Sequence, residues 1–134
     1  MTPDAVATGA ILIVEDDVEA AGLFRQILLT HDYAVRVASD VEHAFAALEQ
    51  ETPSAILVDL HLPGEDGLAF LKQLRAIKRF GGLPAAMITG DYLMDEAVAQ
   101  DLETLGVRLY FKPLWEDDLL AAVATLLSPG GAAR

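Results

Sequence analysis

Residues 54–63 have the sequence SAILVDLHLP, an apolar run that ends abruptly in a carboxylate and is closed by a proline. A short apolar run bounded by turn-forming residues is typical of a strand buried on both faces, as in the middle of a parallel sheet. The carboxylate is Asp59, and the carboxyl end of such a strand is where open α/β sheets bind their ligands. A lone aspartate in this place is more often a helix cap, so Asp59 needs support from the rest of the chain.

Short apolar runs of the same kind recur on both sides of this one. They lie at residues 10–14, 33–38, 84–88 and 107–111. Apolar residues at helical spacing separate them, over about residues 18–30, 41–48, 65–77, 94–105 and 115–127. Strictly alternating strands and helices with short connections predict an α/β fold, with a doubly wound parallel sheet covered by helices on both faces.

Polar residues predict where several of the helices begin and end. Asp17 is a candidate N-cap for the first helix, and Ser39 or Asp40 for the second. Gly106 is a natural residue to follow the end of the fourth helix. These signals support five helices between and after the strands.

The chain of 134 residues predicts one domain, with a flexible leader at residues 1–9, a folded body at 10–128 and a flexible tail at 129–134. No apolar run approaches the roughly 20 residues that span a bilayer, and no signal peptide is recognisable. The absence of cysteine excludes disulfides, zinc-thiolate sites and thiol nucleophiles. We therefore expect a cytoplasmic protein.

The formal charge of −12 bears on the partners of the protein. An acidic surface repels nucleic-acid phosphates and anionic lipid heads alike, so we expect neither nucleic acid nor membrane as a partner. Solubility alone would also explain the excess of acidic residues, and we give the two explanations of the net charge about equal weight.

Chemically active side chains follow four of the five predicted strands. They are Glu15 and Asp16, Asp59, Thr89, and Lys112. The carboxyl ends of parallel strands lie on one edge of the sheet, so these side chains should converge. Three neighbouring carboxylates repel one another and need a cation or protons to remain together. Hard oxygen ligands without histidine or cysteine suit Mg²⁺.

These residue types together match phosphoryl transfer. Asp59 can act as a nucleophile on phosphorus, because carboxylates form aspartyl phosphates. The Lys112 ammonium and Mg²⁺ would stabilise negative charge on the transferring oxygens, while the Thr89 hydroxyl would donate a hydrogen bond. Each residue alone has an ordinary structural explanation as a cap, a turn residue or a surface charge. Their joint occurrence at strand ends favours the functional interpretation.

The sequence resembles the receiver domain of two-component response regulators and is similar to the single-domain chemotaxis regulator. The resemblance runs from about Ala10 to Leu127. It is carried by the segments Ile11–Asp17 with the acidic pair, Leu57–Gly64 with the phosphoacceptor, Ile88–Gly90 with the switch threonine, and Phe111–Pro113 with the lysine. It implies a flavodoxin-like three-layer sandwich with the strand order 2-1-3-4-5.

The resemblance also implies the roles of individual residues. Asp59 would accept a phosphoryl group from a histidine kinase or phosphotransfer protein. Mg²⁺ would be held by Glu15, Asp16, Asp59 and the backbone carbonyl of His61. The peptide bond between Lys112 and Pro113 would be cis.

Further expectations from the family concern activity and assembly. The surface of the fourth helix, fifth strand and fifth helix would change and bind a downstream protein target. The protein would catalyse only its own phosphorylation and dephosphorylation. We expect a monomer or a weak dimer.

The chain departs from the family at the aromatic switch residue three positions before the lysine. That position is Leu109, and strand alternation sends Tyr110 to the opposite face. A phosphorylation signal would then run mainly through the loop after the fourth strand. His61 and Asp91 should flank the path of attacking water and set the lifetime of the acyl phosphate, although both facing solvent without a role is equally compatible.

Two surface features have two interpretations each. Lys72, Arg75, Lys78 and Arg79 form a basic stripe, interpreted first as a solvated face and second as a partner surface. Trp115 is interpreted first as an anchor for the last helix, and an exposed Trp115 would favour a partner surface instead.

The sequence was also compared with the requirements of other functions of proteins with this topology. A flavin carrier of the same topology would need a phosphate cradle after the first strand, where the acids at residues 15–17 repel phosphate. A haloacid-dehalogenase-like phosphatase would need an aspartate at position 61, where the chain has His61. An unphosphorylated scaffold is harder to exclude, because Leu109 replaces the switch aromatic. A free single-domain regulator and a receiver cut from a hybrid kinase have the same sequence features.

Overall fold

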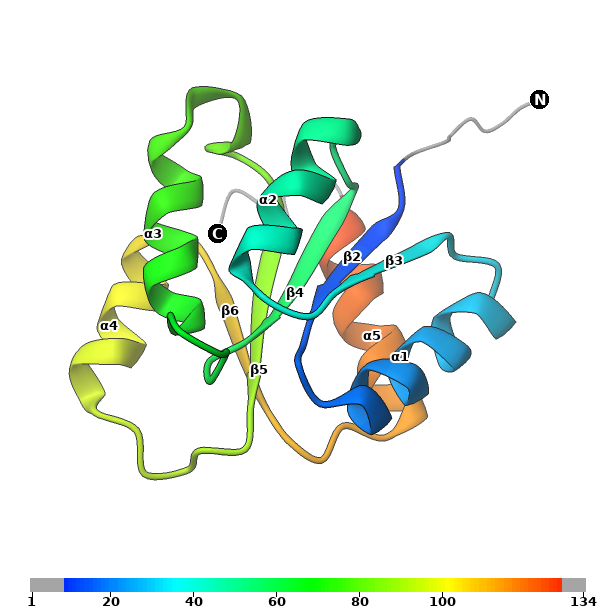
Figure 1. The fold of residues 1–134 in the computed structure, drawn as a ribbon. Coiled ribbons are helices and arrows are strands. Elements are labelled where there is room, and N and C mark those ends of the chain that lie inside the picture. The colour runs from blue at the N-terminus through cyan, green and yellow to red at the C-terminus, as the bar shows by residue number, and fades with distance from the viewer. Residues whose placement is uncertain (1–8, 129–134) are drawn as a thin grey trace.

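The computed structural model describes residues 9–128, which form a five-stranded parallel sheet between two layers of helices (Figure 1). The sheet order is β3-β2-β4-β5-β6, which is the predicted order 2-1-3-4-5 when strands are counted along the chain. The strands are β2 (Ile11–Val14), β3 (Val35–Ala38), β4 (Ala55–Asp59), β5 (Ala85–Thr89) and β6 (Arg108–Phe111). The doubly wound fold is confirmed. The predicted tail and all but the last residue of the predicted leader lie outside the described residues.

Helices alternate with the strands at the predicted places. They are α1 (Val18–Thr30), α2 (Val41–Gln50), α3 (Gly67–Ala76), α4 (Glu96–Thr104) and α5 (Glu116–Leu127), with a 3₁₀ turn, η1 (Lys78–Phe80), after α3. Asp17 and Asp40 cap α1 and α2 through their carboxylates, and Gly106 has a positive φ of 72° after α4. Among the helices of residues 9–128, none is long and apolar enough to cross a bilayer.

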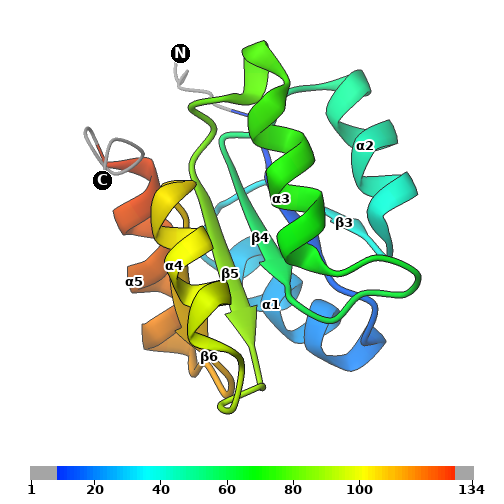
Figure 2. The same ribbon diagram turned by 90° about the vertical axis from the view of Figure 1, so that its left-hand side faces the viewer.

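The two faces of the sheet carry separate apolar cores. Helices α1 and α5 cover one face, and α2, α3 and α4 cover the other (Figures 1 and 2). Alternation along β4 sends Ile56 and Val58 to the α2-α3-α4 side and Leu57 to the α1-α5 side. All five residues of β4 are buried, so this strand is the centre of the fold, as the apolar run predicts.

The start of α3 packs directly against the end of β4. A Cβ atom on Gly67 would lie 2.2 Å from the Asp59 carbonyl oxygen, so the close approach requires glycine. The Gly67 N–H also donates to the Leu60 carbonyl at 2.6 Å. These contacts fix the turn that presents the Asp59 side chain at the sheet edge.

The basic stripe predicted on the third helix is not a uniform solvated face. Arg75 is half-buried and donates hydrogen bonds to the carbonyls of Leu105, Phe80 and Leu83, and burial lowers its pKa. Arg75 therefore joins the ends of α3 and α4 to the start of β5. Helix α3 also ends before residues 78 and 79, which lie in η1.

The interpretation of Trp115 as an anchor for the last helix is wrong. The residue is the N-cap of α5, where its N–H donates to the Asp118 carboxylate at 3.2 Å, and it is 70% exposed. An anchoring tryptophan would be buried, so this exposure favours the second interpretation, a surface for a partner.

Candidate functional site

Three carboxylates meet at the carboxyl edge of the sheet. Glu15 and Asp16 follow β2, and Asp59 is the last residue of the neighbouring strand β4, whose Val58 pairs with Val14. Each of the three offers an oxygen within 4.8 Å of the others. Glu15 and Asp59 are buried, whereas Asp16 is exposed. The predicted convergence is thus confirmed for the three carboxylates.

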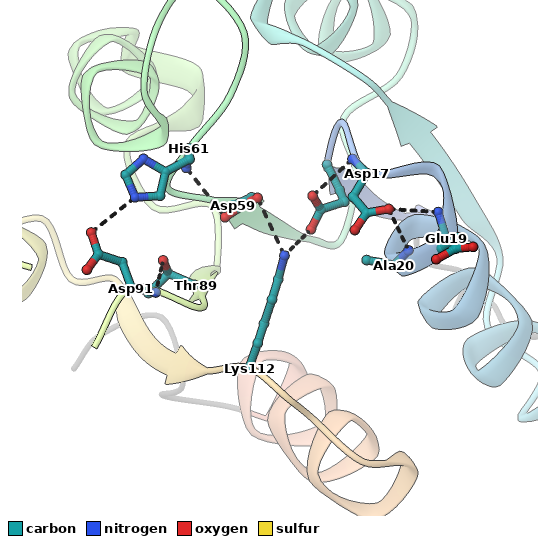
Figure 3. A network of polar contacts seen from close by, with 9 residues as sticks. Asp17, Glu19, Ala20, Asp59, His61, Thr89, Asp91 and Lys112 are labelled. Carbon is teal, nitrogen blue, oxygen red and sulfur yellow. Dashed lines mark hydrogen bonds and ion pairs between the residues drawn. The ribbon is translucent and has the colours of Figure 1, made fainter. Parts of the chain in front are cut away.

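Lys112 joins this cluster from the far side of β5. It directly follows β6, and its Nζ lies 2.8 Å from Glu15 Oε1 and 3.5 Å from Asp59 Oδ2 (Figure 3). Its main-chain N–H donates to the Thr89 carbonyl at 2.8 Å, and its peptide bond to Pro113 is cis, as the resemblance implies. The ammonium thus bridges two carboxylates that would otherwise repel each other.

The contact between Lys112 and the two carboxylates affects the pKa values of Glu15 and Lys112. Burial raises the pKa of Glu15; the Lys112 hydrogen bond opposes that rise and the nearby Asp59 carboxylate adds to it. Burial alone would lower the pKa of Lys112, but the hydrogen bonds and charges of Glu15 and Asp59 outweigh it and raise this pKa. Lys112 is therefore a cation at neutral pH.

The donor set fits a hard divalent cation. Glu15, Asp16 and Asp59 supply only carboxylate oxygens, without histidine nitrogen or cysteine sulfur, and these oxygens are close enough to share one ion. The site is thus an acidic pocket able to bind a metal. The predicted fourth ligand is the carbonyl of His61, whose own N–H donates to Asp59 Oδ1 at 3.4 Å. That ligand stays a prediction.

Thr89 ends β5, beside the end of β4, and is completely buried. Its hydroxyl oxygen accepts a hydrogen bond from the Asp91 N–H at 3.1 Å. Because the hydroxyl accepts in this bond, its proton remains available for donation to another group. Thr89 therefore lies at the predicted strand end with the predicted donor capacity.

Comparison with known proteins gives the same result as the geometry of the site. The model of the response regulator receiver domain matches residues 11–124. The chain belongs to the response regulator receiver family. The chain is 32% identical over 112 residues to the hydrogenase transcriptional regulatory protein HoxA of Bradyrhizobium diazoefficiens. The aligned region covers 84% of this chain but only 22% of HoxA.

Two solved receiver structures resemble it closely. The receiver domain of NtrX from Brucella abortus has a TM-score of 0.78 and 30% identity, covering 87% of this chain and 97% of that one. A CheY-like receiver domain protein from Methanospirillum hungatei has a TM-score of 0.81 and 28% identity, covering 90% and 94%. These similarities support a signalling receiver, and the family interacts with histidine kinases and downstream effectors.

His61 and Asp91, which are predicted to set the lifetime of the acyl phosphate, contact each other. His61 Nε2 lies 3.1 Å from Asp91 Oδ2, at the rim of the site beside Asp59 and Thr89 (Figure 3). The sequence places each residue two positions after a strand-end residue, but no spacing rule indicates their pairing. Their effect on the lifetime of the acyl phosphate stays a prediction.

Leu109 and Tyr110 lie on opposite faces of β6, as predicted. Leu109 packs toward the α2-α3-α4 core and Tyr110 toward the α1-α5 core. Sequence reasoning missed that Phe111, on the same side as Leu109, stacks with Tyr92 from the loop between β5 and α4. Strand alternation could have indicated this, because it places the ring of Phe111 on the same face as Leu109, the position where the family has its switch aromatic residue.

Proposed function

We propose that this receiver accepts a phosphoryl group on Asp59 from the phosphohistidine of a histidine kinase or phosphotransfer protein, in a Mg²⁺-dependent reaction. The observation that carries the proposal is the position of Lys112, whose ammonium lies against the carboxylates of Asp59 and Glu15. A buried carboxylate next to a fixed cation is suited to bind an anionic phosphoryl group and to attack it.

The transfer exchanges one bond to phosphorus for another. An Asp59 carboxylate oxygen forms the new O–P bond while the P–N bond of the donor breaks. The donor imidazole keeps the electron pair of that bond and takes up a proton. Lys112 balances charge on the transferring oxygens, and the Thr89 hydroxyl donates a hydrogen bond to one of them.

Glu15, Asp16, Asp59 and the His61 carbonyl would hold the metal ion. When bound, Mg²⁺ supplies positive charge that lowers the repulsion between the carboxylates and the incoming phosphoryl oxygens. The acidic, all-oxygen donor set supports this choice of metal.

His61 and Asp91 would set the lifetime of the phosphorylated state. Their mutual hydrogen bond places an imidazole and a carboxylate at the rim through which water would enter. Replacing either residue with alanine should change the rate of dephosphorylation, and unchanged lifetimes in both variants would remove this part of the proposal.

The output of the domain would be a change in the α4-β6-α5 surface that a downstream protein target recognises. The exposed Trp115 supports a protein contact near this surface. We place the protein in the cytoplasm as a monomer or weak dimer that binds neither nucleic acid nor membrane. It would catalyse only its own phosphorylation and dephosphorylation.

A scaffold that works without phosphorylation is the second candidate, favoured by the non-aromatic Leu109. A receiver belonging to a hybrid kinase would also accept a phosphoryl group on Asp59, as in the first candidate function. Incubation with Mg²⁺ and a small acyl phosphate, followed by intact mass measurement, separates phosphorylation from the scaffold. We expect a gain of one phosphoryl group that is lost in Asp59→Asn and after chelation of Mg²⁺. No gain under any Mg²⁺ condition would favour the scaffold.

A further inference from the structure

Tyr92 connects the β5-α4 loop to the end of β6 by two contacts. Its ring stacks on Phe111 with centroids 5.2 Å apart and an interplanar angle of 21°. Its hydroxyl donates a hydrogen bond to the main-chain carbonyl of Lys112. The side chain is 62% exposed, so these contacts, and not burial in a core, determine where it lies.

The carbonyl that Tyr92 binds belongs to the lysine of the Asp59 site. Strand β6 ends at Phe111, so Lys112 has left the regular pairing of the sheet. Its N–H is held by the Thr89 carbonyl at 2.8 Å, and its carbonyl by the Tyr92 hydroxyl. Both main-chain polar groups of Lys112 are thus held by β5 and the loop that follows it.

Fixing this backbone restricts where the Lys112 ammonium can go. A lysine side chain has a long stem with much rotamer freedom, which must be given up when Nζ contacts Glu15 and Asp59. A fixed backbone reduces the remaining freedom, and small displacements of a catalytic group reduce rates strongly. We propose that Tyr92 is a positioning residue for Lys112, acting through its hydroxyl and its stack on Phe111. The kinetic consequence rests on the proposed phosphoryl transfer to Asp59.

The loop around Tyr92 has its own hydrogen bonds. The Asp91 N–H donates to the Thr89 hydroxyl at 3.1 Å, and the Leu93 N–H donates to the Asp91 carboxylate at 3.0 Å. The residues on both sides of Tyr92 are therefore held without help from its ring. Replacing Tyr92 should leave the fold intact and remove mainly its contacts with Phe111 and Lys112.

A double-mutant cycle tests whether Tyr92 acts through Lys112. Rates of phosphorylation by an acyl phosphate with Mg²⁺ are measured by intact mass for Tyr92→Phe and Tyr92→Ala. Loss of the hydrogen bond alone should slow the reaction roughly two- to tenfold, and loss of the stack as well roughly five- to hundredfold. Leu93→Ala is the matched control, because Leu93 is the adjacent, 93% exposed loop residue, and its rate should equal that of the wild type.

The same substitutions in a Lys112→Ala background should have no effect on the residual rate, which longer incubation makes measurable. A general disturbance of the loop would slow both backgrounds by the same factor, and that outcome would overturn the inference. Equal rates for Tyr92→Ala and the wild type would also overturn it.

A second measurement does not depend on phosphorylation. In protein with ¹³C-labelled lysine, the ε-methylene NMR signal of Lys112 should shift in Tyr92→Phe and shift further in Tyr92→Ala, and stay in place in Leu93→Ala. An unshifted signal would overturn the positioning role. If the wild type gains no mass, the proposed function fails, and this signal alone decides whether Tyr92 positions Lys112.

Discussion

Strands β4 and β6 both end beside the same cluster of charges, yet they are built differently. Every residue of β4 is buried between two helical layers, and this burial determines the position of Asp59 at the end of the strand. Strand β6 lies at the edge of the sheet, and all of its residues are partly or largely exposed. Within residues 9–128 it pairs with β5 alone, and its last residue, Phe111, stacks on Tyr92 from the neighbouring loop. Burial of every residue stabilises the central strand, whereas the edge strand is less buried and its end also contacts an exposed aromatic residue of a loop.

The largest expected difference between these strands is in stability. Leu57→Ala removes a side chain that is 1% exposed in β4 and should lower the free energy of unfolding by about 3–5 kcal/mol. Phe111→Ala in β6 starts from a side chain that is 39% exposed and should cost only about 1–2 kcal/mol, including its lost stack. Urea unfolding of both variants measures the comparison, and an equal or larger loss for Phe111→Ala would contradict it.

The turn after β4 gives a smaller but more local effect. Gly67→Ala places a Cβ against the Asp59 carbonyl, at 2.2 Å before relaxation, and should cost about 1–3 kcal/mol. It should also slow phosphorylation, because the backbone that carries Asp59 must move. Gly22→Ala is the matched control: nothing lies within 4 Å of its added Cβ in helix α1. Helix propensity predicts a gain of about 0.5–1 kcal/mol there. A neutral Gly67→Ala would show that the turn is adaptable.

The packed strands and the charged strand ends could be predicted from the sequence because each depends on short-range pattern and on shared topology. Buried strands appear as apolar runs, and parallel connections bring Glu15, Asp59 and Lys112 to one edge whatever the side-chain details. The class of site therefore follows from residues that are far apart in the chain.

The contacts of Arg75, the pairing of His61 with Asp91 and the stack of Tyr92 on Phe111 could not be predicted in this way. Each depends on the direction of a long side chain across a loop, which periodicity does not describe. The exposure of Trp115 is of the same kind, since a tryptophan at a helix start can turn inward or outward. Edge and loop positions thus carry the features that only the structure provides.

The smallest expected effect lies on the surface, away from both strands. Asp40 caps α2 and holds the pKa of His43 above its ordinary value of 6.5, while the His43 N–H and ring hold the pKa of Asp40 below its ordinary 3.8. The pair's stabilising contribution is therefore complete just below the ordinary pKa of histidine. It is lost as the pH rises through the folded-state pKa of His43, and also as the pH falls through that of Asp40.

Asp40→Asn keeps a capping side chain and removes the charge. NMR titration of His43 in this variant should show a pKa that returns toward its ordinary value, with an unchanged rate of phosphorylation at Asp59. A His43 pKa that stays raised without the Asp40 charge would contradict the assigned cause.

The most direct test of the central claim is to locate the phosphoryl group after reaction with an acyl phosphate and Mg²⁺. Borohydride reduces an aspartyl phosphate to homoserine, and peptide mass spectrometry then identifies the modified position. We predict homoserine at position 59 and no other reduced carboxylate. Reduction at Asp16 or Asp17 with an unmodified Asp59 would contradict it.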